Sequence, residues 1–233
     1  MIKKHIPNAL TCSNLLCGCI GVVEAFHNNI LLSCVLIGLA LVFDFFDGFA
    51  ARMLGVSSPI GRDLDSLADM VTFGLLPSII VYQLLMRSIA DLSGIWMAYP
   101  AFLIAIFSAI RLAKFNNDPR QTDGFIGLPT PANGILIASI PFILESAGPE
   151  LTEFILNTKH LLIFTCLMSF LLVAELPLIA LKFKSFSWQP NRARYLLIIG
   201  TIVLLLAFKI LAVPIIIMYY LLLSLLFGVI KKN

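Results

Sequence analysis

Residues 30–69 read ILLSCVLIGLALVFDFFDGFAARMLGVSSPIGRDLDSLAD, an apolar run that ends in a dense group of aspartates. The apolar part, 30–51, is long enough to cross a bilayer as a helix, because about 20 apolar residues span the hydrocarbon core. Comparable runs recur at about 9–26, 66–86, 94–113, 131–147, 160–181, 194–209 and 211–230. The sequence therefore predicts an all-α polytopic membrane protein with about eight transmembrane helices.

The composition of the whole chain supports a membrane protein. Its 233 residues are 60% hydrophobic and only 12% charged, whereas about 25% of the residues in soluble domains are charged. The net charge of +3 is small, which argues against a nucleic-acid partner. No stretch is long enough for a separate soluble domain, so we expect residues 1–233 to form a single membrane-embedded domain surrounded by membrane lipids.

The basic residues predict the orientation, because cytoplasmic loops of membrane proteins hold an excess of Lys and Arg. An even number of spans puts both termini on one side of the membrane. That side receives all but three of the 16 Lys and Arg residues, the exceptions being Arg87, Lys159 and Lys209. We therefore expect both termini to be cytoplasmic, in a protein of the cell inner (cytoplasmic) membrane.

The aspartates between 44 and 69 lie at membrane depth, where an unpaired carboxylate costs several kcal/mol. Asp44 and Asp47 are three positions apart and Asp65 and Asp69 are four apart, so each pair lies on one face of a helix. Hard oxygen donors in this number suit Mg²⁺ or Mn²⁺, and two such ions can bridge a diphosphate. Asp63 points away from Asp65 and Asp69 and lies nearest the loop, so it is expected to be either a salt-bridge or capping residue of the loop or a ligand contact, with neither favoured.

Two other interpretations of the acidic cluster remain open. The aspartates could instead form intramembrane salt bridges with Arg52, Arg62 and Lys114, although three cations do not neutralise five acids. Intramembrane acids also mark ion pathways, so a divalent-metal transporter is an alternative. Such transporters tend to repeat their acids in two halves, and this chain has no second cluster. Glu175, in the sixth predicted span, is expected to be buried.

The acidic stretch resembles a known family. The spacing Asp44-x2-Asp47-Gly48-x2-Ala51-Arg52-x8-Gly61-x3-Asp65-x3-Asp69 matches all eight fixed positions of the CDP-alcohol phosphotransferase signature. The resemblance implies an enzyme that transfers the phosphatidyl group of CDP-diacylglycerol to an alcohol and releases CMP. It also implies two metal ions, Mg²⁺ or Mn²⁺, with Asp69 as general base and the ligands Asp44, Asp47, Asp65 and Asp69.

The same resemblance implies contacts to the CDP-lipid. Residues 7–11, which precede the first span, resemble the family's entrance segment, although a capped helix start would explain them equally well. The implied CDP-lipid contacts are Asn8, Thr11, Gly48, Ala51, Arg52, Ser58 and Gly61. A guanidinium beside a diphosphate also has an evident electrostatic role, which favours Arg52 on physical grounds.

The acceptor alcohol depends on residues outside the signature, in the region of about 108–133. Residues 108–116, SAIRLAKFN, and 124–133, GFIGLPTPAN, resemble the phosphatidylserine synthase branch, with Ile110 and Asn133 as mild departures. The resemblance implies serine as acceptor and a homodimer. The predicted acceptor contacts are Arg111, Lys114, Asn116, Pro129 and Pro131.

Alternatives to serine and to these contacts remain. Arg111 at a helix end is positioned to meet an amino-acid carboxylate, but Arg111 and Lys114 could also serve only as cytoplasmic anchors. A cluster of Arg111, Lys114 and Arg120 would suit a phosphorylated acceptor. The alternative acceptors are glycerol 3-phosphate and inositol or its phosphate.

Overall fold

The computed structural model describes residues 5–56, 58–118, 125–181 and 187–230, which are almost entirely helical. The α-helices are α1 (His5–Phe26), α2 (Ile30–Leu54), α3 (Pro59–Asp69), α4 (Leu76–Ser88), α5 (Leu103–Asn117), α6 (Thr130–Ser146), α7 (Pro149–Ile155), α8 (Thr158–Val173), α9 (Trp188–Phe208) and α10 (Ala212–Ile230). A π-helix, η2 (Met70–Leu75), joins α3 to α4, and two 3₁₀ segments, η3 (Leu92–Phe102) and η5 (Lys209–Leu211), precede α5 and α10. Two short strands, β1 (Phe125–Ile126) and β2 (Pro177–Leu178), complete the described chain.

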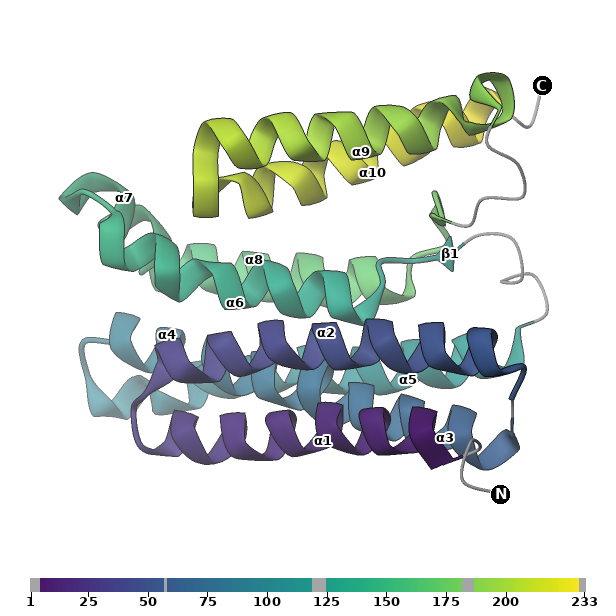
Figure 1. Cartoon of the computed structure of the whole chain (residues 1–233). Coiled ribbons are helices and arrows are strands. Elements are labelled where there is room, and N and C mark those ends of the chain that lie inside the picture. Colours follow the sequence, from purple (N-terminus) through teal and green to yellow (C-terminus); the bar gives the residue numbers. More distant parts are fainter. Residues whose placement is uncertain (1–4, 57, 119–124, 182–186, 231–233) are drawn as a thin grey trace.

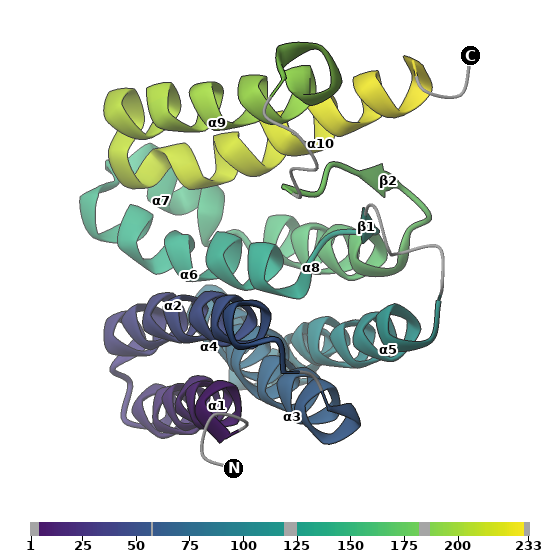
Figure 2. The same ribbon diagram turned by 45° about the vertical axis from the view of Figure 1, so that its right-hand side comes forward.

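The helices form tiers that follow the order of the sequence (Figure 1). The first half of the chain, α1 to α5, makes one end of the stack, α6 and α8 lie in the middle, and α9 and α10 lie outermost. The turned view in Figure 2 shows the same order, so the tiers are not an effect of projection. The main core lies between α1, α2, α4, α5 and α6, and its fully buried side chains include Ile37, Phe73, Ile80 and Ile104.

Successive long elements run in opposite directions between the two ends of this bundle (Figure 1). In the part of the chain that the structure describes, five helical stretches are long and apolar enough to cross a membrane, and the bent pair α7 and α8 makes a sixth. The expected eight spans are therefore not confirmed. Two features lower the number of candidate spans. The helix α6 has only 17 residues and is too short to be counted. The stretch Trp188–Phe227 is counted as one span, although it contains two helices, α9 and α10, that fold back on each other.

The sixth predicted span, 160–181, is shorter than expected because α8 ends at Val173. The chain then forms β2, which pairs antiparallel with β1, so that Leu178 lies opposite Phe125. Glu175 is exposed beyond the end of α8, so the expectation that it is buried was wrong. Several cations used for the orientation lie outside the described residues: Lys3, Lys4, Arg120, Lys182, Lys184, Lys231 and Lys232.

The third predicted span begins earlier than expected and is not a uniform α-helix. Ser58 caps α3, since its hydroxyl accepts a hydrogen bond from the Gly61 N–H at 3.0 Å, and Pro59 occupies the first turn. The backbone widens into η2 directly after Asp69 and returns to α geometry at Leu76. The helix α1 lies against this π-helix so closely that a Cβ on Gly18 would come within 2.3 Å of Thr72 Oγ1.

Candidate active site

Three aspartates from two helices converge at one end of the first half of the bundle. Asp44 and Asp47 come from α2 and Asp65 from α3, and one carboxylate oxygen from each lies within 4.8 Å of the other two. Gly55 ends α2, Ser58 caps the start of α3, and both helices pack against α1. The paired spacing expected from the sequence thus brings three of the four predicted metal ligands together.

The acidic cluster is not neutralised by basic side chains. Among the described residues, no Lys or Arg nitrogen lies within 4.0 Å of any of these carboxylates. The alternative that the cluster is held together by salt bridges is therefore wrong for the described part of the chain. Three close carboxylates without a cation repel one another, which is costly in a low-dielectric interior.

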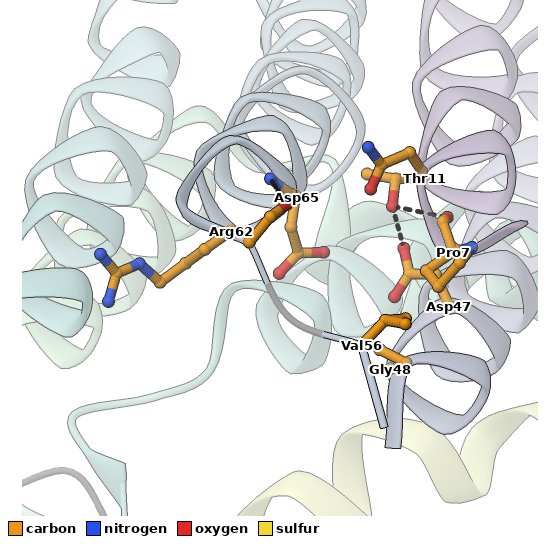
Figure 3. A pocket seen from close by; sticks show the side chains of 11 residues that line it. Pro7, Thr11, Asp47, Gly48, Val56, Arg62 and Asp65 are labelled. Atoms are coloured by element: carbon orange, nitrogen blue, oxygen red, sulfur yellow. Dashed lines mark hydrogen bonds between the residues drawn. The ribbon is translucent and has the colours of Figure 1, made fainter. Parts of the chain in front are cut away.

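The contacts of Asp47 and Asp65 show that the cluster has an oxygen atom left for a cation. Asp47 is buried, and the Thr11 hydroxyl of α1 lies 2.7 Å from its Oδ2 and 3.1 Å from the Pro7 carbonyl oxygen, as Figure 3 shows. The Oδ1 atom of Asp65 is buried and has no hydrogen-bond partner among the described residues. An orphaned carboxylate oxygen beside two other carboxylates fits a hard divalent cation, which takes oxygen ligands.

Asp69, the fourth predicted ligand, lies outside the group of three. It is buried, and its Oδ1 accepts a hydrogen bond from Asn14 Nδ2 of α1 at 3.3 Å. Asp44 and Asp65 are near enough to repel its charge, and Arg111 is near enough to attract it. Asp69 is therefore within electrostatic range of both the acidic cluster and Arg111.

A pocket of about 230 Å³ opens beside the cluster. Six of the seven predicted CDP-lipid contacts line it, together with the acids Asp47 and Asp65: these six are Asn8, Thr11, Gly48, Ala51, Ser58 and Gly61. Arg52 is exposed in the last turn of α2 and is not part of the lining, so its role stays a prediction.

The lining also contains Pro7, Val56 and Arg62, which the sequence did not single out as contacts. Pro7 belongs to the entrance segment, residues 7–11. Val56 and Arg62 lie between Asp47 and Asp65 in the sequence, and this position is the signal from which their place in the lining could have been predicted. The Arg62 side chain points away from Asp65 in Figure 3.

The predicted acceptor contacts lie apart from this pocket and do not form one group. Arg111 is buried, and its Nη1 donates to Thr130 Oγ1 at 2.9 Å. Lys114 is exposed, whereas Asn116 donates to Ser66 Oγ of α3 at 2.8 Å. Pro129 immediately precedes α6, and Pro131 lies in its first turn.

The surroundings of Arg111 contain polar atoms with unused hydrogen-bonding capacity. Arg111 Nε and both amide atoms of the fully buried Asn133 have no hydrogen-bond partner within the described ranges. Asn133 follows Thr130 by three residues on α6, so the two side chains share a helix face. Buried polar groups are normally satisfied, and these atoms therefore indicate a place for a polar ligand that sequence reasoning did not define.

The loop before α6 is fixed by backbone hydrogen bonds to the end of α8. The N–H of Gly127 donates to the Leu176 carbonyl at 3.0 Å, and the N–H of Leu128 to the Leu171 carbonyl at 2.8 Å. Gly127 has φ +79°, and a Cβ there would come within 2.5 Å of the Leu172 carbonyl oxygen. Only glycine fits this position without strain, and the loop that leads to Thr130 is thereby held in place.

The fold and the acidic pocket agree with a known class of protein. The family model described as CDP-alcohol phosphatidyltransferase matches residues 4–230. The chain belongs to the CDP-alcohol phosphatidyltransferase family, and with its long apolar helices it is an integral membrane protein. Family membership favours an enzyme over the divalent-metal transporter.

Comparison with individual proteins shows which members of the family the chain is similar to. The chain is 33% identical over 173 residues to the CDP-diacylglycerol–serine O-phosphatidyltransferase of Bacillus subtilis (strain 168), covering 74% of this chain and 89% of that protein. It is 38% identical over 133 residues to the enzyme of the same name from Helicobacter pylori (strain J99), covering 56% of this chain and 54% of that protein. It is 31% identical over 151 residues to the archaetidylserine synthase of Methanothermobacter thermautotrophicus, covering 63% of this chain and 61% of that protein.

Proposed function

We propose that this protein transfers the phosphatidyl group of CDP-diacylglycerol to the hydroxyl of L-serine, giving phosphatidylserine and CMP. The observation that carries the proposal is the group of Asp44, Asp47 and Asp65 in a chain of this family, because Asp47 and Asp65 of this group line the pocket. The names of the relatives support serine as the acceptor.

The acidic residues are proposed to hold two divalent cations, Mg²⁺ or Mn²⁺. Asp44, Asp47 and Asp65 would supply most of the ligand atoms, and a carboxylate oxygen of Asp69 would supply a further one. The orphaned Oδ1 of Asp65 and the lack of basic partners among the described residues support this assignment. Bound cations supply the positive charge that offsets the diphosphate and its leaving group.

The pocket is proposed to hold the cytidine diphosphate. Gly48 and Ala51 leave one wall of α2 without bulky side chains, and Gly61 does the same on α3. Thr11 and Asn8 offer polar groups from α1, and Ser58 offers a hydroxyl near the start of α3. Arg52, exposed beside this wall, is proposed to meet the diphosphate from outside.

Serine is proposed to bind between Asp69 and Arg111. The guanidinium of Arg111 and the amide of Asn133 would bind the serine carboxylate and amine, which explains their unpartnered atoms. Asp69 would accept the hydroxyl proton while the serine oxygen attacks the lipid-side phosphorus. The bond from that phosphorus to the bridging oxygen breaks, and the electron pair leaves with CMP, so that no covalent enzyme intermediate forms. A positioned base contributes about 10²- to 10⁴-fold in rate.

The chain is proposed to cross the cytoplasmic membrane eight times as one catalytic domain, with its active site and termini at the cytoplasmic face. The alternating direction of the long elements supports this topology. Arg52, Arg62 and Lys114 fall at the end of the bundle that holds the acids, whereas Arg87 and Lys159 fall at the other. A homodimer is also proposed, as the family resemblance implies; the apolar side chains that α9 and α10 expose along their length are available to lipid or to a second subunit.

An acceptor panel tests the function directly. Purified protein is incubated with CDP-diacylglycerol, Mg²⁺ or Mn²⁺, and either L-serine, glycerol 3-phosphate, inositol or inositol phosphate, and CMP release is measured. We expect metal-dependent release with serine and a lipid product that contains serine. Release with another acceptor but not with serine would refute the assignment of serine, and no release with any acceptor would refute the enzyme.

A further inference from the structure

Asn14 of α1 is a fully buried polar residue that the proposed mechanism leaves without a role. Its Nδ2 donates to Asp69 Oδ1 at 3.3 Å, across 55 positions of sequence. Its Oδ1 is buried and has no hydrogen-bond partner among the described residues. An unsatisfied buried polar atom costs about 1–3 kcal/mol, so this asparagine occupies its position at a cost to stability.

The backbone around Asn14 is held against the π-helix η2. Thr72, in the middle of η2, donates from Oγ1 to the Asn14 carbonyl oxygen at 3.2 Å. One turn further along α1, Gly18 lets Thr72 approach more closely than any side chain would allow. Segments of π-helix are frequent at functional sites. This contact fixes the spacing between Asn14 and Asp69, because η2 follows Asp69 directly in the sequence.

The helix α1 thus reaches two aspartates from adjacent turns. Thr11 contacts Asp47, and Asn14, three residues later, contacts Asp69. The amide of Asn14 does not ionise at ordinary pH, so it is not itself an acid or a base. Its N–H group engages one oxygen of Asp69, Oδ1, and thereby restricts the rotation of the carboxylate, which also interacts with Asp44.

We propose that Asn14 is a positioning residue for the transfer reaction: it orients the Asp69 carboxylate so that its other oxygen meets the acceptor hydroxyl, and the Thr72 contact keeps Asn14 in place. The inference rests on the proposed function, in which Asp69 takes the hydroxyl proton. Asn14 is not part of the pocket lining, and its side chain reaches the proposed reaction centre through the hydrogen bond to Asp69.

The test separates turnover from binding. Asn14→Leu keeps the approximate size of the side chain and removes the donor. We expect kcat to fall about 10- to 100-fold, a part of what a positioned base contributes, with KM for CDP-diacylglycerol and serine changed less than about twofold. The control is Ser33→Ala, which removes a buried hydrogen bond of 2.8 Å to the Gly21 carbonyl of α1 far from the acids. Its kcat should stay within about twofold of the wild type.

A double substitution provides the readout that a purely structural role would not produce. In an Asp69→Asn background, Asn14→Leu should lower the residual rate no further, because residues that act as a unit are not additive. Additive losses, an unchanged kcat in Asn14→Leu, or an equal loss in Ser33→Ala would each overturn the proposal.

A milder pair of variants covers the case in which Asn14→Leu does not fold. Thr72→Val removes the hydroxyl that holds Asn14 and should lower kcat severalfold, whereas Thr72→Ser should retain it; equal activity in the two would overturn the proposal. Wild-type protein that releases no CMP with any acceptor would refute the proposed function and this inference together. A normal wild type with an unaffected Asn14→Leu refutes only the inference.

Discussion

Asp65→Asn should make the metal-free protein more stable while abolishing its activity. Asp65 faces Asp44 and Asp47, with carboxylate oxygens within 4.8 Å of one another. At an effective dielectric constant of about 20, two unit charges at this distance repel by about 3.5 kcal/mol. Asparagine removes the charge of residue 65 and offers an N–H₂ donor to the two acids that remain.

The net gain is smaller than the sum of two such repulsions, because the open pocket admits water and the side chains relax. We expect a gain of about 1–2 kcal/mol in the presence of a chelator, which corresponds to a rise of roughly 2–8 °C in the unfolding midpoint for a chain of this size. Turnover should fall below about a tenth of wild type, since shared coordination requires every ligand.

Thermal unfolding in mild detergent, with EDTA and then with Mg²⁺ or Mn²⁺, measures both effects. The wild type should be stabilised by the metal, and Asp65→Asn should lose most of that response. Asp63→Asn is the matched control, because Asp63 is exposed and lies outside the cluster. A lower midpoint for Asp65→Asn in EDTA, or activity above about a tenth, would refute shared metal coordination by the three acids.

Four further outcomes are expected. Gly127→Ala should destabilise the protein by about 1–3 kcal/mol, measured by thermal unfolding, because its φ is +79° and a Cβ would meet the Leu172 carbonyl; an unchanged midpoint would contradict this. Arg111→Gln should raise KM for serine about 10-fold or more while KM for CDP-diacylglycerol stays constant, and equal changes in both would count against a carboxylate contact. Without serine, labelled CMP should not exchange into CDP-diacylglycerol, and rapid exchange, or normal turnover in Asp69→Asn, would rule out direct displacement. Crosslinking in mild detergent should give dimers, and monomers alone would contradict the homodimer.

The part of the site that could be predicted from sequence is the part built from local spacing. Asp44 and Asp47 share a helix face by their separation, and a short turn forces Asp65 onto the neighbouring helix, so the group of three followed from helix geometry. The pocket lining followed instead from the family resemblance, because Asn8 and Thr11 on α1 lie far in the sequence from that turn.

The parts that could not be predicted depend on contacts between distant segments. Nothing in the sequence pairs Asn14 with Asp69 or Arg111 with Thr130, because these contacts arise only when α1, α3, α5 and α6 are packed. The π-helix η2 also gave no signal, since periodicity assumes 3.6 residues per turn throughout. The end of α8 was misplaced because the apolar run continues into a strand.

The π-helix also restricts how the length of this chain can vary. Each residue of an α-helix turns the chain by about 100°, and the π-helix Met70–Leu75 already holds one residue more per turn than an α-helix, so inserting a further residue there would rotate α4 by about that angle relative to α3. The fully buried face of α4, formed by Leu76, Ile80 and Leu84, would then leave the core, or the acids of α3 would leave the site. Loops between helices can gain or lose residues without this penalty. The number of residues between Asp69 and Leu76 is therefore as much a part of the catalytic apparatus as the aspartates themselves.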